Sequence, residues 1–190
     1  MEKLIIGSRG SKLAIKYAEI AKKVFLKELD IEIEIKKITT EGDLILDRRT
    51  SEIGGKGEFI KNIEKELISK NIDVAVHSLK DVPSIKTKGL KMGCFLKRND
   101  PQEVFINKAN LTLDKVKKNS IIGTSSLRRE FQLKHLRPDL KFKLIRGNID
   151  TRIKKLDEGQ YDSIILAKAG YFITSEFNPT SFADFSLFLT

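Results

Sequence analysis

One local pattern constrains the fold of this chain more than any other feature. A short apolar run ends at a polar junction, and an amphipathic helical pattern follows it. Leu4–Ser8, Ser120–Thr124 and Lys141–Ile145 are three such runs, and the junctions after them contain Gly, Ser or Asn. Strands that alternate with helices form mostly parallel sheets, because a helical crossover brings the chain back in the same direction. The sequence therefore predicts an α/β fold, with the expected ligand edge at the carboxyl ends of its strands.

The chain has 190 residues, which is enough for one large domain or two small ones. The polar break at Lys97–Pro101 is the expected hinge, so we predict two α/β lobes, residues 1–98 and 99–175. The tail, residues 176–190, is rich in Phe and lacks Lys and Arg. We expect a strand within Ala183–Leu189, and we predict that it returns to the first lobe.

Leu90–Leu96 is a further apolar run that predicts a strand, and Cys94 inside it is expected to be a small core residue. Because Cys94 is the single cysteine, an internal disulfide is excluded. His77 and His135 lie far apart in sequence, and neither has a second metal ligand at a suitable spacing. We therefore expect no metal site.

The net charge of +10 favours an anionic ligand, either a small polyanion or a nucleic acid. Trp is absent and few aromatic residues lie among the basic ones, which weakens a base-stacking interpretation. Arginine binds carboxylates and phosphates through two parallel hydrogen bonds. Five arginines lie at or just after the Gly-, Ser- or Thr-containing junctions, namely Arg9, Arg128, Arg129, Arg146 and Arg152.

Several junctions also contain helix N-cap residues. Ser11 and Asn148 are typical N-caps, and Gly159 is a typical helix stop. Ser125 and Ser126 open a helix that carries two arginines in its first turn, where cations oppose the helix dipole. This arrangement is explained if an anion binds there; the alternative is that both side chains point into water.

The segment Ile72–Pro83 combines an apolar run with several polar residues. We expect Ile72–Val76 to form a buried strand whose carboxyl end delivers Lys80 and Asp81 to the ligand edge. The alternative is an ordinary strand end with solvated charges. Before it, Glu41–Gly57 is a glycine-containing loop that predicts a mobile lid, and it lacks the spacing of a nucleotide-binding phosphate loop.

These motifs together resemble porphobilinogen deaminase, also called hydroxymethylbilane synthase. The resemblance runs in order over residues 1 to about 171. Its motifs are Gly7–Ser11, Thr40–Asp43, Gly54–Phe59, His77–Pro83, Asn99–Pro101, Gly123–Arg129, Arg137–Asp139, Arg146–Asn148 with Thr151–Arg152, and Ala167–Gly170.

The resemblance implies two lobes similar to those of type II periplasmic binding proteins, with the active cleft between the lobes. It also implies a transferase that joins four porphobilinogen units head to tail on a dipyrromethane primer and releases ammonia, in heme and chlorophyll biosynthesis. Asp81 matches the catalytic carboxylate. Lys56 and Phe59 match the lid. The matches to residues that bind substrate and cofactor carboxylates are Arg9, Ser11, Ser78, Lys80, Thr124, Ser125, Ser126, Arg128, Arg129, Arg146, Gly147, Asn148 and Arg152.

The sequence departs from the family pattern in two places. Tyr17 stands where relatives typically carry glutamine, and Lys12 where many carry proline. The family's third domain, with the cysteine that holds dipyrromethane through a thioether, has no counterpart here, and Cys94 does not match that cysteine. We therefore expect a minimal deaminase that holds dipyrromethane non-covalently.

Three other interpretations remain at this point. The same fold can bind porphobilinogen or a linear tetrapyrrole without turnover, the chain can be a non-functional truncated product, or its charge can serve nucleic-acid binding. The deaminase interpretation predicts a monomeric cytoplasmic protein with porphobilinogen as its small-molecule partner, and neither a nucleic acid nor a membrane. No apolar run approaches the roughly 20 residues that a membrane span needs.

Overall fold

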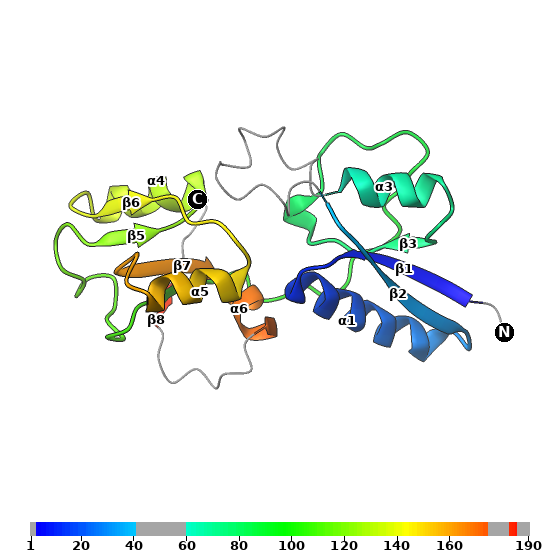
Figure 1. Ribbon diagram of the computed structural model, residues 1–190, viewed down its shortest axis with the longest axis horizontal. Coiled ribbons are helices and arrows are strands. Elements are labelled where there is room, and N and C mark those ends of the chain that lie inside the picture. The colour runs from blue at the N-terminus through cyan, green and yellow to red at the C-terminus, as the bar shows by residue number, and fades with distance from the viewer. Residues whose placement is uncertain (1–2, 41–59, 175–182, 186–190) are drawn as a thin grey trace. The chain divides into compact units, whose positions relative to one another are not determined.

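The computed structural model describes residues 3–40, 60–174 and 183–185. The chain divides into two compact units, Met1–Lys97 and Arg98–Thr190, and each of them has its own sheet. Figure 1 shows both units as α/β structures. The predicted alternation of strands and helices is therefore confirmed.

The sheet of the first unit has the strand order β2-β1-β3. β1 (Lys3–Arg9) pairs in parallel with β2 (Glu32–Ile38) on one side and with β3 (Val74–Ala75) on the other. The parallel start of the fold is as predicted. β3 is shorter and less buried than the expected strand at Ile72–Val76, because it lies at an edge of the described sheet.

Helices cover both faces of this sheet. α1 (Lys12–Glu28) begins at its predicted N-cap, because the Ser11 hydroxyl accepts a hydrogen bond from the Ala14 amide at 3.3 Å. Alternate residues of β1 point to opposite faces, so Ile6 packs with residues of α1 while Ile5 packs with Ile63 of α3 (Lys61–Ile68). The first unit therefore has two small apolar layers, one on each face.

The second unit contains a mixed sheet with the strand order β6-β5-β7-β4-β8. β5 (Ile121–Gly123) pairs in parallel with β6 (Lys141–Lys143) and with β7 (Ser163–Ala167). β4 (Glu103–Ile106) is antiparallel to β7 and to β8 (Ala183–Phe185). The carboxyl ends of β5, β6 and β7 therefore share one edge, and the first residue of β4 lies at that same edge.

The helices of the second unit also enclose its sheet. Leu133 of α4 (Leu127–Leu136) packs with Phe105 on one face, whereas Leu156 of α5 (Ile149–Asp157) packs with Val104 on the other. α6 (Lys168–Thr174) joins the face of α5. This is a three-layer α/β/α arrangement, and it can be followed in Figure 1.

The prediction of a strand at Leu90–Leu96 was wrong. Residues 91–98 are exposed, and this part of the chain forms neither a helix nor a strand. Cys94, expected in the core, is exposed as well. An extended apolar run becomes a buried strand only when a neighbouring strand pairs with its backbone, and no described strand pairs with this one.

The predicted return of the tail to the first lobe was also wrong for the described residues. Ala183–Phe185 form a strand, but this strand pairs with β4 of the second unit in the register Phe105↔Ala183 and Glu103↔Phe185. The residues around it, 175–182 and 186–190, lie outside the described part of the chain. The apolar character of the tail correctly indicated a strand. The tail residues Ala183–Phe185 pair with β4 because the other side of β4 is already paired with β7 and this side is open to another strand.

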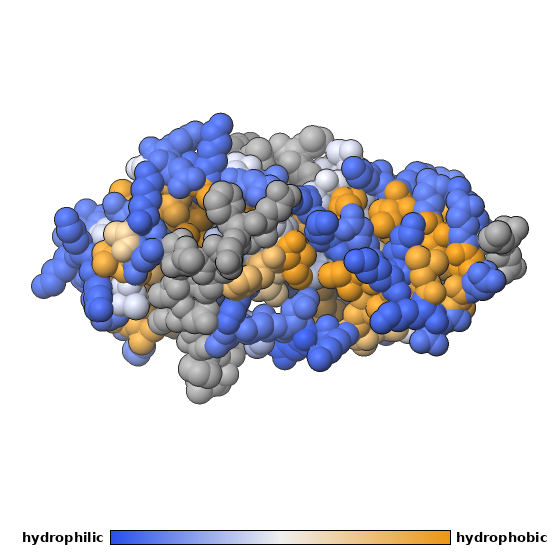
Figure 2. All heavy atoms as spheres, turned by 90° about the horizontal axis from the view of Figure 1, so that it is seen from below, coloured by the Kyte–Doolittle hydropathy of each residue, from blue (hydrophilic) through white to orange (hydrophobic). Residues whose placement is uncertain are grey.

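The surface is mainly hydrophilic with smaller apolar areas on the face that Figure 2 shows. Among the described residues, Ile85, Phe95 and Phe131 are large apolar side chains that are exposed. No helix in the described part is both long enough and apolar enough to cross a membrane.

Two substitutions on α4 test this packing. Replacing Leu133, which is fully buried, with alanine removes core contacts, and we expect the free energy of unfolding to fall by about 2–5 kcal/mol. Phe131 lies two residues earlier and is 76% exposed, so Phe131→Ala should change it by no more than about 0.5 kcal/mol. Urea denaturation measures both values, and equal losses in the two variants would contradict the described packing.

Candidate functional site

A small cavity in the first unit brings together residues of two predicted motifs, Gly7–Ser11 and His77–Pro83. Its volume is about 40 Å³, and Asp81, Arg9, Ser11 and Ser78 all line it. Four of the predicted site residues of this unit are therefore neighbours, although Arg9 and Asp81 lie more than seventy positions apart in sequence. The remaining lining residues are Leu13, Ala14, Tyr17, Ile60, Val76 and His77.

Backbone pairing explains why these residues meet. β1 and β3 are parallel, and the Val76 amide donates to the Gly7 carbonyl at 3.1 Å, so both chains reach the same edge of the sheet together. A short 3-10 helix (Leu79–Asp81) then turns the chain, with the Asp81 amide donating to the Ser78 carbonyl at 2.9 Å. The carboxylate is thus held by a compact turn at the ligand edge.

His77 adds a neutral group to this cavity. Burial lowers the pKa of its imidazole below the ordinary value of 6.5; the nearby Asp81 carboxylate opposes that shift and Arg9 reinforces it. At neutral pH the ring is therefore uncharged and has one donor and one acceptor nitrogen. His77 was noted in the sequence as part of the motif, but only its half-buried position in the cavity with Asp81 and Arg9 marks it as a site residue.

Other predicted residues of the first unit are placed differently. Lys80 is exposed and is not among the residues that line the cavity. Lys56 and Phe59, the predicted lid residues, lie outside the described part of the chain. Tyr17, noted as a departure from the family pattern, does line the cavity.

In the second unit, the junction after β5 leads directly into α4. Ser126 is the N-cap, and its hydroxyl accepts a hydrogen bond from the Arg129 amide at 3.4 Å. The Thr124 hydroxyl, which is buried, accepts one from the Ser126 amide at 3.2 Å. Ser125 lies between them and is half-buried. These bonds fix the first turn of α4 and therefore the starting points of Arg128 and Arg129.

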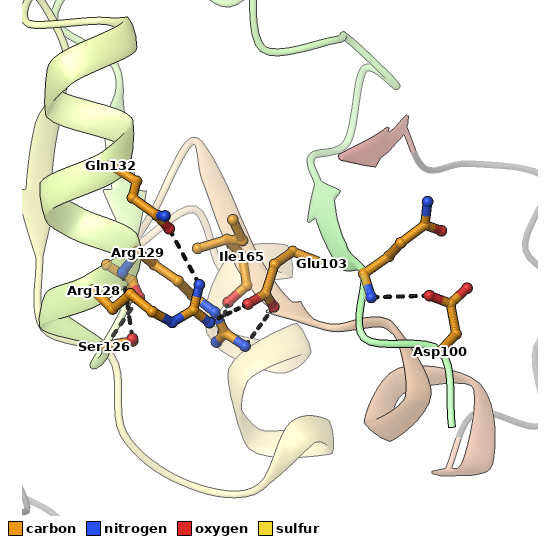
Figure 3. Close-up of polar contacts among 9 residues, drawn as sticks. Asp100, Glu103, Ser126, Arg128, Arg129, Gln132 and Ile165 are labelled. Atoms are coloured by element: carbon orange, nitrogen blue, oxygen red, sulfur yellow. Dashed lines mark hydrogen bonds and ion pairs between the residues drawn. The ribbon is translucent and has the colours of Figure 1, made fainter. Parts of the chain in front are cut away.

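Both arginines of this turn reach a carboxylate of the protein itself. Arg128 Nη2 lies 2.6 Å from Glu103 Oε1, and Arg129 Nη2 lies 2.5 Å from Glu103 Oε2. Figure 3 shows the two guanidinium groups converging on Glu103 from α4. A carboxylate of the protein therefore already contacts both arginines, and the alternative in which both side chains simply point into water was wrong.

The junction after β6 leads into α5 in a similar way. Asn148 is the predicted N-cap, and its side-chain oxygen accepts hydrogen bonds from the Thr151 amide at 2.8 Å and the Thr151 hydroxyl at 2.7 Å. Gly147 has φ +107°, a left-handed conformation that favours glycine. Arg152 Nε donates to the Gly147 carbonyl at 2.9 Å, which ties the arginine back to the junction.

The arginines of the two junctions lie close enough to influence one another. The pKa of Arg152 is lowered to about 10, mainly by burial and then by the positive charges of Arg129 and Arg146. Arg146 is itself buried. Positive charges that influence one another favour a negatively charged ligand nearby, and Glu103 offsets only part of this charge through its contact to Arg129.

Buried donor atoms agree with an anion site in the second unit. Arg129 Nε is buried and has no hydrogen-bond partner among the described residues. Together with the seryl and threonyl hydroxyls of the β5–α4 junction, this atom fits a carboxylate ligand. Among the described residues, no group of three or more His, Cys, Asp or Glu side chains is arranged to hold a metal ion.

Glu103 is the site residue that sequence reasoning missed. It is 3% exposed and stands at the head of the apolar segment Val104–Ile106. The signal in the sequence is a charged residue at the start of an otherwise apolar strand. Its position at the ligand edge follows only from the antiparallel direction of β4, because the first residue of a parallel strand lies at the opposite edge.

Comparison with known proteins identifies the family. Residues 4–174 match the family model described as porphobilinogen deaminase, dipyromethane cofactor binding domain. The chain belongs to the porphobilinogen deaminase family. The curated porphobilinogen deaminases of Staphylococcus aureus strains JH9 and Newman are each 51% identical to it over 171 residues.

The similarity covers 90% of this chain and 56% of each Staphylococcus aureus protein, so the chain spans little more than half the length of those relatives. Porphobilinogen deaminases are transferases of tetrapyrrole biosynthesis, and the matched part is the domain that the family model assigns to dipyrromethane binding. The resemblance seen in the sequence motifs is therefore confirmed at the level of the family.

A solved structure supports the predicted fold class. An ancestral cationic amino acid solute-binding protein is similar with a TM-score of 0.51 at 14% identity, over 99% of this chain and 78% of that one. Similarity at this level of identity concerns the fold alone. The two units thus have the architecture of type II periplasmic binding proteins, as the resemblance implied.

The lowered pKa of His77 predicts a dependence of stability on pH. In the unfolded chain His77 titrates near 6.5, whereas the folded protein takes up that proton only at lower pH. The unfolded state therefore binds more protons as the pH falls through about 6.5, and the free energy of unfolding should decrease.

Thermal unfolding between about pH 7.5 and about pH 5.5 measures this effect. His77→Gln should show a smaller loss of stability over that range than the parent chain. His135 remains in both proteins and serves as an internal control. The same dependence on pH in both proteins would contradict a neutral, half-buried His77.

Gly147 gives a second prediction. A Cβ atom there would lie 2.7 Å from Thr151 Cγ2, in addition to the cost of φ +107°, so Gly147→Ala should lower the free energy of unfolding by about 1–3 kcal/mol. Gly159 is the matched control, because it has φ +76° but a Cβ added there would meet no atom within 4 Å. Chemical denaturation should show the smaller loss for Gly159→Ala, and a larger loss there would contradict the steric argument.

Proposed function

We propose that this chain catalyses the hydroxymethylbilane synthase reaction, in which four porphobilinogen units are joined head to tail with release of ammonia. The product is a linear tetrapyrrole used for heme and chlorophyll biosynthesis, and the expected location is the cytoplasm. The observation that carries the proposal is the cavity of the first unit, where Asp81 lies with Arg9 and Ser11 in a family member 51% identical to curated deaminases.

Asp81 is the proposed catalytic residue. Loss of ammonia from the aminomethyl group of porphobilinogen leaves an azafulvenium cation, whose positive charge a nearby carboxylate stabilises. The α-carbon of the growing chain then attacks the exocyclic methylene carbon, and the same carboxylate accepts the proton that is lost from the new linkage. A neutral His77 beside Asp81 leaves the negative charge of the carboxylate available for the cation.

The second unit supplies the proposed sites for the acetate and propionate groups of each pyrrole. Arginine suits this role because its planar group forms two parallel hydrogen bonds with one carboxylate. The half-buried hydroxyls and the helix N-termini of α4 and α5 add further donors. The proposed residues are Thr124, Ser125, Ser126, Arg128, Arg129, Arg146, Gly147, Asn148 and Arg152, with Arg9, Ser11, Ser78 and Lys80 acting from the first unit.

We further propose that this chain holds dipyrromethane without a covalent bond. When bound, dipyrromethane supplies the free α-carbon to which the first porphobilinogen is added. The buried Arg129 Nε and the hydroxyls of the β5–α4 junction fit its carboxylates. Cys94 is exposed and does not line the Asp81 cavity, which argues against a thioether at this residue.

Two measurements test the proposal. Porphobilinogen is incubated with the purified chain in the presence of dipyrromethane, and the acidified, oxidised product is read at the Soret absorbance of porphyrins. Asp81→Asn should lower the initial rate at least about 100-fold, because the isosteric amide cannot stabilise a cation or take up a proton. Asp30→Asn is the charge-matched control, since Asp30 is exposed and lies outside the cavity.

Absence of porphyrin from well-folded parent chain, together with measurable binding of porphobilinogen, would instead favour a non-catalytic porphobilinogen or tetrapyrrole binding protein on the same fold. Denaturing intact-mass spectrometry tests the mode of cofactor binding separately. The mass of the loaded chain should equal the mass of the polypeptide alone, and an added pair of pyrroles would refute non-covalent binding.

A further inference from the structure

Glu103 is a buried carboxylate whose role the proposed chemistry leaves unexplained. Its side chain is 5% exposed, and the antiparallel pairing of Glu103 with Ala167 brings it to the edge where β5 and β7 end. Acidic side chains are rarely buried unless they are paired. Here the partners are two arginines of the proposed carboxylate-binding site, so a negative charge stands inside a site that is meant to bind negative charges.

The two arginines that Glu103 contacts differ in their surroundings. The side chain of Arg129 is 11% exposed, and its Nη1 also donates to the Ile165 carbonyl of β7 at 3.4 Å. The side chain of Arg128 is 39% exposed, and its Nη1 donates to Gln132 Oε1 at 3.2 Å. Figure 3 shows Arg128 between Glu103 and Gln132, and Arg129 between Glu103 and Ile165.

Because each guanidinium group has contacts to two different residues, its orientation is restricted. A guanidinium group carries five N–H donors in a rigid plane, so two fixed contacts determine the direction of the others. For Arg129 the contacts to Glu103 and Ile165 leave Nε buried and without a partner among the described residues. Arg128 keeps 39% of its side-chain surface exposed in spite of its contacts, so a ligand in solution can reach it.

We propose that Glu103 is a positioning residue that orients Arg128 and Arg129 for the carboxylate groups of the ligand. Glu103 does not touch the ligand; it holds both guanidinium planes so that their remaining donors are arranged before a carboxylate arrives. Pre-arranged donors lose less side-chain freedom on binding, and this increases affinity. The inference rests on the proposed function in taking the pyrrole acetate and propionate groups as the ligand carboxylates.

A simple charge argument predicts the opposite effect. Glu103 adds one negative charge beside the site, so removing it should attract an anion more strongly. If Glu103 instead occupies the place of a ligand carboxylate, its removal should also tighten binding. The positioning role alone predicts that binding becomes weaker when the carboxylate is lost, and the sign of the change therefore separates the explanations.

The test uses the full 190-residue chain and two probes, porphobilinogen and citrate, at one fixed ionic strength. Isothermal titration calorimetry measures Kd for the parent chain, Glu103→Gln and Glu158→Gln. The glutamine at position 103 keeps the shape of the side chain but loses the negative charge that pairs with both arginines, and it presents an NH2 group in place of one carboxylate oxygen. Glu158 is the matched control, because it forms an exposed pair with Lys154 at 3.8 Å and removing it changes the net charge equally.

The positioning role predicts that Glu103→Gln raises Kd at least about tenfold for the probe that the parent chain binds, while Glu158→Gln leaves it unchanged. An unchanged or lower Kd in folded Glu103→Gln would overturn the inference. Circular dichroism establishes that each variant is folded, so a loss of affinity cannot be attributed to unfolding.

If Glu103→Gln does not fold, a second variant tests the positioning role of Glu103. Glu103→Asp keeps the charge but is one methylene shorter and cannot reach both arginines from the same backbone position. A raised Kd supports positioning, and a parent-like Kd overturns it. Failure of both variants to fold would make Glu103 a folding requirement and would also overturn the positioning role.

The two probes separate this inference from the proposed function. A parent chain that binds citrate but not porphobilinogen contradicts the proposed function, and Glu103 is then judged on the Kd of citrate. A parent chain that binds porphobilinogen equally well with and without Glu103 overturns the positioning role and leaves the proposed function standing. A parent chain that binds neither probe contradicts both.

Discussion

Parallel pairing of short apolar strands is the constraint on which the remaining structure depends. In each unit it places the junctions that follow neighbouring strands at one edge of the sheet. The residues of those junctions are small or polar because they must turn the chain and cap the next helix. The same geometry that buries the strands therefore gathers hydroxyls, guanidinium groups and one carboxylate where a ligand can reach them.

The second unit shows how a fold tolerates several like charges in a small volume. Arg129, Arg146 and Arg152 repel one another, and the lowered pKa of Arg152 reflects both this repulsion and burial. Glu103 offsets part of that charge through contacts to Arg128 and Arg129. The balance leaves the region positively charged overall, which suits an anionic ligand better than a fully neutralised cluster would.

Much of this arrangement was predictable from local sequence, because it depends on local physics. Ser11, Ser126 and Asn148 cap helices through hydrogen bonds to residues three positions away, so their neighbours in sequence are sufficient to identify them. Leu90–Leu96 shows the limit of that reasoning. Its apolar residues suggested a buried strand with Cys94 inside, but a strand also needs a neighbour to pair with its backbone, and sequence pattern does not report whether one is present.

The sequence by itself determined the α/β class, the helix starts, the family and the residues that bring charge to the strand ends. These follow from periodicity, capping and ordered motifs, all of which are properties of neighbouring residues. Only the tertiary structure decided that the arginines of α4 meet Glu103, that His77 lines a cavity with Asp81, and that Ala183–Phe185 extends the second sheet. Each of these depends on which strands pair and in which direction, a choice made by contacts between segments that lie far apart in the chain.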